Sequence, residues 1–151
     1  GLMPNTAKPL PFELSPVMSL RATISQIKTI EKGEQVSYGR TYTARKSTRL
    51  ATVTCGYADG YPRLLSNKGY VLIGGKKAMI TGRICMDQFM IDVTGFEGLK
   101  EGEKVTLMGY DGDEHISAEE IGELSGRFNY ELVCLISHRI PRVYIGGGTQ
   151  N

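Results

Sequence analysis

The sequence predicts an all-β domain, a partly open β-barrel or sandwich of about eight to ten short strands with one short helix. Three observations support this. Residues 17–30 alternate apolar and polar side chains and are rich in β-branched residues, the pattern of a long half-buried strand. Nineteen glycines among 151 residues indicate many turns. A capped helical pattern occurs only near residues 117–126.

The elements are expected in the following order. Residues 1–16 contain four of the six prolines, which oppose helix and central strand, so an extended connector is expected there. The strand at 17–30 ends in a turn at 31–34. Gly74-Gly75 is suited to a primed hairpin turn between two later strands. Beyond the first, strands are expected at 49–56, 70–73, 78–84, 89–93, 104–108, 131–136 and 142–145.

The expected helix begins after Ser117, which stands three residues before Glu120 in the spacing of a capping box. Ile121 and Leu124 supply its apolar stripe, and Gly126 is the expected end. The chain therefore divides into a connector at 1–16, a β domain at 17–146 and a tail at 147–151.

Composition excludes several classes of protein. Eighteen Lys and Arg against sixteen Asp and Glu give a net charge of +2, unlike the basic balance of a nucleic-acid binder. No apolar run approaches the ~20 residues of a membrane span. The three cysteines show no CxxC spacing, which opposes a disulfide framework or a metal site. A reducing compartment follows, so we expect a cytoplasmic protein, or one at the cytoplasmic face if a membrane domain is attached.

Taken singly, the polar residues give few catalytic signals. The sequence has no nucleophile elbow, Walker loop or HExxH motif, and His115 and His138 stand far apart. Tyr38 and Tyr57 would ordinarily be strand aromatics, and Asp87 an ordinary turn residue. Composition and local pattern alone therefore predict only a soluble all-β domain and no specific function.

Four longer segments carry more information. They resemble, in order and spacing, the carboxy-terminal domain of alanine racemases, and the resemblance covers roughly residues 16–145. The family's enzymes are homodimers that depend on pyridoxal 5'-phosphate, with a (β/α)8 barrel that carries the cofactor lysine and a β domain that follows it. Residues 1–16 would then connect to such a barrel. The segments are EKGEQVSYGRTYTA (31–44), CGYADGYPR (55–63), GRICMDQFMIDV (82–93) and ISHRIPRVY (136–144).

The resemblance implies interconversion of L- and D-alanine, the latter for peptidoglycan. Racemisation removes a proton from one face of the α-carbon and returns one to the other, so it needs two acid/base groups. The cofactor spreads the charge of the carbanion. In the family the barrel lysine serves one face, and a tyrosine from the other subunit's β domain serves the second. Tyr38 of the VSYG segment matches that tyrosine, and without a barrel the chain is expected to be inactive.

Further site residues follow from the same resemblance. Met86 matches the position whose backbone N–H holds the substrate carboxylate, and Cys85 and Asp87 flank it and fix the turn. Tyr57 matches a tyrosine that narrows the inner substrate gate. No metal ligand is implied.

Four more positions belong to the entrance and gate. Arg63, Arg83 and Ile136 match entrance residues, where positive charge would draw an amino-acid carboxylate inward. His138 departs from the pattern, because the family usually has a tyrosine there that narrows the gate and contacts the cofactor phosphate. A smaller ring raises serine as an alternative substrate, as in the racemases of vancomycin-resistance clusters.

Two other functions remain as alternatives. Pyridoxal-phosphate decarboxylases pair a similar barrel with a similar β domain, but VSYG and RICMDQ accompany the racemases. A non-catalytic β-barrel module could bind single-stranded nucleic acid. The net charge of only +2 and the lack of an aromatic stripe among Lys and Arg oppose that function.

Overall fold

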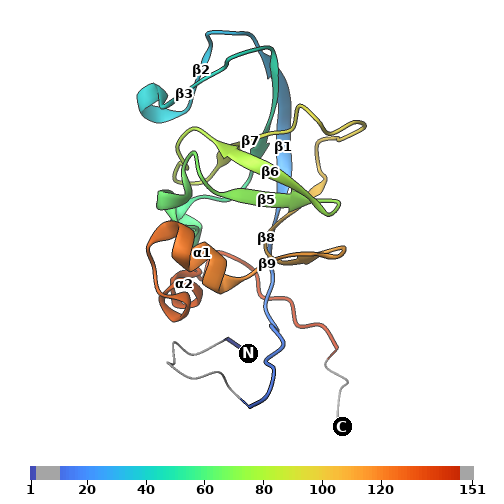
Figure 1. Ribbon diagram of the computed structural model, residues 1–151, viewed down its shortest axis with the longest axis vertical. Helices are drawn as coiled ribbons and strands as arrows, with labels where there is room; N and C mark the ends of the chain where they lie inside the picture. Colours follow the sequence, from blue (N-terminus) through green and yellow to red (C-terminus); the bar gives the residue numbers. More distant parts are fainter. Residues whose placement is uncertain (3–10, 147–151) are drawn as a thin grey trace.

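The computed structural model describes residues 1–2 and 11–146, and this part of the chain is mostly β structure (Figure 1). Three short 3-10 turns are η1 (Tyr38–Arg40), η2 (Tyr57–Asp59) and η3 (Arg63–Leu65), and the helices are α1 (Ala118–Ser125) and α2 (Asn129–Leu135). The described strands are β1 (Leu20–Ile30), β2 (Gln35–Val36), β3 (Tyr42–Thr43), β4 (Thr48–Val53), β5 (Tyr70–Ile73), β6 (Lys76–Thr81), β7 (Phe89–Asp92), β8 (Lys104–Asp111) and β9 (Glu114–Ile116).

Seven of these strands form one antiparallel sheet in the order β1-β4-β7-β6-β5-β8-β9. Strand β1 is long enough to pair with β4 along its C-terminal part and with β8 along its N-terminal part. This second pairing curls the sheet back on itself. Strands β5 and β8 share only the register pair Leu72 with Thr106, so the barrel stays partly open. The predicted all-β, partly open architecture is confirmed.

The curled sheet encloses the main core. Strands β4, β7 and β8 supply much of this core, and Val53, Phe89 and Leu107, one from each strand, are fully buried. The Tyr61 ring stacks on Phe89 with ring centroids 5.3 Å apart. A smaller cluster, which includes Ile30, lies beneath the β2–β3 ribbon at one end of the molecule (Figure 1). The helices α1 and α2 lie near the opposite end.

Two predicted strands are wrong. Residues 131–136 were expected as a strand, but helix α2 occupies residues 129–135 and buries Asn129 and Leu132 at helical spacing against α1. Six residues are too few to separate a period of 2 from one of 3.6, and packing decides. Residues 142–145 are exposed and have no regular structure.

The remaining elements follow the prediction with shifted ends. The hairpin turn has positive φ at Gly74 and Gly75. Helix α1 is capped as expected, since Ser117 Oγ accepts the Glu120 N–H at 3.0 Å. The Glu120 carboxylate accepts instead from the Tyr70 hydroxyl. Strand β1 begins at Leu20, later than expected, and the short strands β2, β3 and β9 were not predicted.

Some sequence predictions fall outside this description. Residues 3–10 of the expected connector and the whole expected tail at 147–151 lie outside the described residues. Within residues 1–2 and 11–146, no helix has both the length and the apolarity that crossing a bilayer requires.

Candidate functional site

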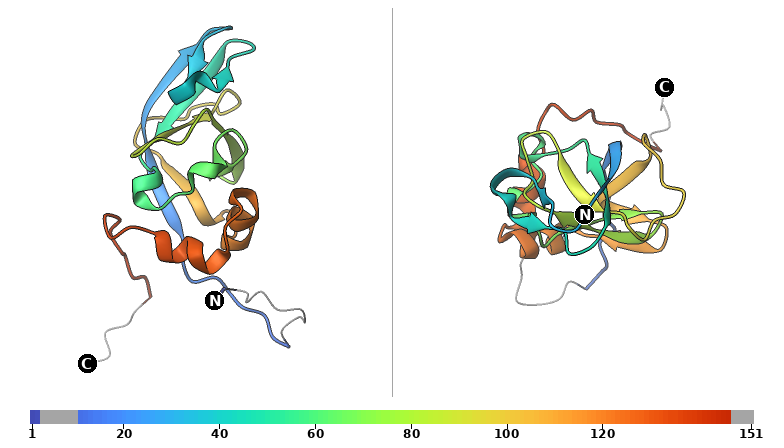
Figure 2. Two further views of the ribbon diagram at one scale, coloured as in Figure 1. Left: turned by 90° about the vertical axis from the view of Figure 1, so that its left-hand side faces the viewer. Right: turned by 90° about the horizontal axis from the view of Figure 1, so that it is seen from above.

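Segments from four distant parts of the chain meet on one side of the sheet, and we call this the motif face. Figure 2 (left) looks onto that side of the molecule. Direct hydrogen bonds and close backbone contacts join the segments in sequence-distant pairs. The motif face consists of residues 37–40, 56–59, 82–88 and 136–139, which belong to the four segments quoted above.

The loop at 37–40 is pressed onto the end of β6. Ser37 Oγ donates a hydrogen bond to the carbonyl oxygen of Arg83 at 2.6 Å. A Cβ on Gly39 would lie 3.2 Å from the Arg83 guanidinium, and a Cβ on Gly82 would lie 2.9 Å from Ser37 Cβ. These contacts leave the Tyr38 side chain uncovered at the tip of the loop, 72% exposed.

The next contact joins η2 to the turn at 85–88. A Cβ on Gly56 would lie only 2.2 Å from the Met86 carbonyl oxygen, so only glycine permits this approach. The Tyr57 N–H donates to the Cys85 carbonyl at 3.0 Å, and the Ala58 N–H donates to the Met86 carbonyl at 2.9 Å. Two predicted site segments are therefore locked together through their main chains.

The amide of Met86 is open. Its carbonyl is used by η2, but its N–H has no hydrogen-bond partner among the described residues. Met86 is 53% exposed, and Tyr57 beside it is 43% exposed. An N–H that has no described partner and lies in an exposed residue can donate a hydrogen bond to an anionic group from outside the chain.

A cation links three segments of the motif face. Arg139 places Nε 3.2 Å from Asp59 Oδ1, and donates a hydrogen bond from Nη2 to Asp87 Oδ1 at 2.6 Å. The hydrogen bond that Arg139 donates to Asp87 and the negative charge of Asp59 raise the pKa of Arg139 above its ordinary value. Sequence reasoning gave no role to Asp59 or Arg139. The signal that could have found Asp59 is its position three residues after Gly56, the spacing at which a carboxylate in the first turn accepts the N–H of the N-cap residue.

The four entrance residues are less closely gathered. Arg63 is exposed at the start of η3, whereas Arg83 is half-buried against Gly39. Ile136 is buried in the main core behind α2, and His138 is exposed in the turn that follows. Among the described residues, Arg83 lies against the Tyr38 loop at Gly39, whereas Ile136 belongs to the main core.

The thiols near the motif face differ in environment. Cys55 is buried, and burial together with the nearby charge of Asp59 raises its pKa to about 12. It is therefore protonated at neutral pH and is not a nucleophile. Cys85 is half-buried with Sγ 3.4 Å from Ser37 Oγ, which places it between the Tyr38 loop and the Met86 turn.

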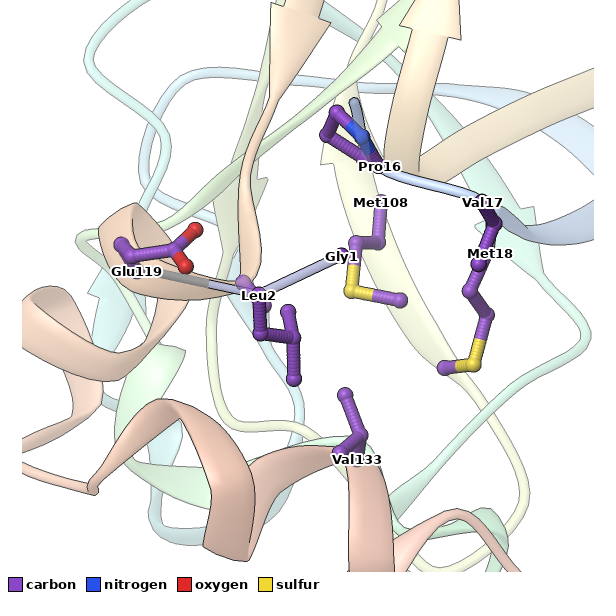
Figure 3. A pocket seen from close by; sticks show the side chains of 9 residues that line it. Gly1, Leu2, Pro16, Val17, Met18, Met108, Glu119 and Val133 are labelled. Carbon is purple, nitrogen blue, oxygen red and sulfur yellow. The ribbon is translucent and has the colours of Figure 1, made fainter. Parts of the chain in front are cut away.

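A cavity of about 200 Å³ lies elsewhere, between the N-terminal segment and helices α1 and α2 (Figure 3). Its walls are mainly apolar, and none of the predicted site residues lines it. The motif face is thus separate from this cavity. The apolar lining includes Leu2, Val17, Met18, Met108 and Val133.

Comparison with known proteins identifies the family. The profile described as "Alanine racemase, C-terminal domain" matches residues 17–144. The chain belongs to the alanine racemase family. It is 46% identical over 150 residues to the alanine racemase of Halothermothrix orenii, a match that covers 97% of this chain and 40% of that protein. The chain thus spans well under half the length of this racemase.

Solved alanine racemases have the same fold over this part. The structure from Bacillus anthracis with bound L-Ala-P superposes with a TM-score of 0.86 at 46% identity, covering 92% of this chain and 35% of that one. The structure from Bartonella henselae with covalently bound pyridoxal phosphate gives a TM-score of 0.83 at 34% identity, covering 89% and 37%. These likenesses imply a further domain in the relatives, preceding or following the matched part.

Proposed function

We propose that the chain is the β domain of a pyridoxal-phosphate-dependent alanine racemase, and that it completes an active site on a barrel domain of a partner subunit. The observation that carries this proposal is the motif face, where an exposed phenol, Tyr38, and an unpartnered amide, that of Met86, come from segments joined through Cys85 and Arg83. Residues 1–16 would connect the two domains.

The donor set fits one part of a site for this cofactor. The motif face offers a hydroxyl and an N–H but contains no lysine, so it suits the amino-acid substrate rather than the cofactor's aldehyde. When bound, pyridoxal phosphate withdraws electrons from the α-carbon and makes its proton acidic. The lysine that holds it would belong to the barrel domain.

Each residue of this chain then has a defined task. Tyr38 Oη removes or returns the α-proton on one face of the substrate. The Met86 N–H binds the substrate carboxylate, in a turn held by Cys85 and Asp87. Tyr57 narrows the space beside Met86, while Arg63 and Arg83 attract the carboxylate of incoming alanine.

A chimaeric enzyme tests this function. The preceding domain of the Bacillus anthracis racemase is joined to residues 17–146 of this chain, with and without Tyr38→Phe. Deuterium incorporation from heavy water is followed separately for L- and D-alanine. Tyr38→Phe keeps the ring but loses the hydroxyl, so exchange on the L-enantiomer should fall by ~10²–10⁴-fold and exchange on the D-enantiomer much less. Equal losses in both, or none, would contradict the role of Tyr38.

Serine is the second candidate substrate. His138 is exposed in a turn of the motif face, where the family resemblance leads one to expect a larger tyrosine. A smaller ring at the gate leaves room for a hydroxymethyl group. The two substrates differ in only that group, so one residue at the gate can change the preference.

A further inference from the structure

We propose that Arg139 is a positioning residue that holds the Met86 amide in the orientation that binds the substrate carboxylate. This inference deepens the proposed function and rests on it. The described hydrogen bonds and ion pairs of Arg139 do not include Met86. Its guanidinium instead bridges two aspartates on either side of the Met86 turn, Asp59 in η2 and Asp87 directly after Met86.

One end of this bridge is fixed in the protein. Asp59 is buried, with only 8% of its surface exposed. Its Oδ2 accepts the Gly56 N–H at 2.9 Å, and its carbonyl oxygen accepts the Ser137 N–H at 3.0 Å. The position of Asp59 is therefore fixed. Because Arg139 pairs with both aspartates, it holds the more exposed Asp87 at a fixed distance from Asp59.

The direction of the Met86 N–H follows from peptide geometry. In a trans peptide the N–H and the C=O of one unit point in opposite directions. The unit between Cys85 and Met86 has its C=O bound to the Tyr57 N–H, so the Met86 N–H must point away from η2. The turn closes when the Cys85 N–H donates to the Gln88 carbonyl at 2.9 Å.

Asp87 lies inside that turn, and its only described ion pair is with Arg139. If the bridge is lost, the two peptide units that flank Met86 are held against η2 only by the hydrogen bonds from the Tyr57 and Ala58 N–H groups, and these bonds open more often. A lysine cannot replace the arginine, because a single ammonium does not present two N–H groups at the fixed angle of a guanidinium.

Amide exchange of the 151-residue chain tests the bridge without any need for activity. Arg139→Lys and Asp87→Asn should each speed exchange of the Tyr57 and Ala58 amides, by about tenfold. Arg127→Lys is the matched control, because Arg127 pairs with Glu131 on the helical part of the chain and should leave these amides unchanged. Unchanged exchange in both test variants would overturn the proposal.

The steady-state kinetics of the chimaeric enzyme test the link to the carboxylate. Arg139→Lys should raise KM for both enantiomers of alanine about tenfold and change kcat by less than about twofold, because a carboxylate contact serves ground state and transition state alike. Faster exchange with an unchanged KM, or a fall in kcat alone, would overturn the positioning role. If the parent chimaera is inactive while Arg139→Lys still speeds amide exchange in the 151-residue chain, the proposed function is overturned. The structural role of the bridge is then retained.

Discussion

Ser37 couples backbone strain to the position of the Tyr38 phenol. Its φ of 65° and ψ of −179° fall in a region that essentially only glycine occupies, at a cost of ~1–3 kcal/mol. The hydrogen bond from Ser37 Oγ to the Arg83 carbonyl offsets part of that cost. Serine at position 37 therefore carries backbone strain that glycine would avoid, but its hydroxyl fixes the position of the loop.

Two substitutions at Ser37 separate these effects. Ser37→Ala keeps the strain and loses the hydrogen bond, so urea unfolding should show a loss of about 1–2 kcal/mol. Ser37→Gly relieves the strain and should stay within about 0.5 kcal/mol of the parent. In the chimaeric enzyme, however, Ser37→Gly should still lower kcat/KM, because the loop that carries Tyr38 is no longer held. A fully active glycine variant would contradict the positioning of Tyr38 by Ser37.

His138 sets the second expectation at the residue scale. In the chimaeric enzyme, His138→Tyr should lower kcat/KM for L-serine relative to L-alanine by roughly 10–200-fold, the range for one small group in a pocket. The ratio of the two substrates cancels any general loss of activity. An unchanged ratio would remove His138 from substrate selection.

At the scale of the elements, the contact between η2 and α2 leaves no room for an added side chain. Gly60 follows η2 with a φ of 93°, and a Cβ there would lie 2.1 Å from the Leu135 carbonyl oxygen at the end of α2. The methyl group would therefore push the helix away from the motif face. Gly98 has a similar φ of 71° but nothing within 4 Å of such a Cβ.

This pair of glycines supports a stability prediction. Gly98→Ala should cost only the left-handed backbone, about 1–2 kcal/mol. Gly60→Ala carries the same cost and a backbone clash, so its loss should exceed that of Gly98→Ala by at least about 2 kcal/mol. Urea unfolding of the 151-residue chain measures both. Equal losses in the free energy of unfolding for the two variants would show that α2 can shift away from Gly60 without destabilising the fold.

Local sequence patterns predicted most of the secondary-structure elements but not the tertiary contacts between them. Alternation in β1, the glycine pair after β5 and the cap of α1 are properties of neighbouring residues, and each was predicted. Helix α2 was missed because its short apolar run fits either period, and only packing on α1 decides. The bridge from Arg139 to Asp59 joins residues 80 positions apart, and no local signal contains such a contact.

For the whole molecule, the exposed apolar side chains of the motif face are the main feature. Tyr38, Tyr57 and Met86 are all exposed, and the segments that carry them are joined to one another by hydrogen bonds. Exposed apolar groups gathered in this way mark interaction surfaces. The roles of the site residues were predicted from the family resemblance of four sequence segments. That these segments lie together could be seen only in the three-dimensional structure.

The 151-residue chain alone should therefore bind substrate poorly and racemise none of it. Racemisation needs two acid/base groups on opposite faces of the α-carbon, and the proposed function assigns this task to only one residue of the chain, Tyr38. With pyridoxal phosphate and L-alanine present, the chain should form D-alanine no faster than a matched Tyr38→Phe chain, measured by chiral chromatography. The chimaeric enzyme, assayed in parallel, shows that the assay detects turnover. D-Alanine that forms with the chain alone and disappears with Tyr38→Phe would mean that the second acid/base group lies within these 151 residues.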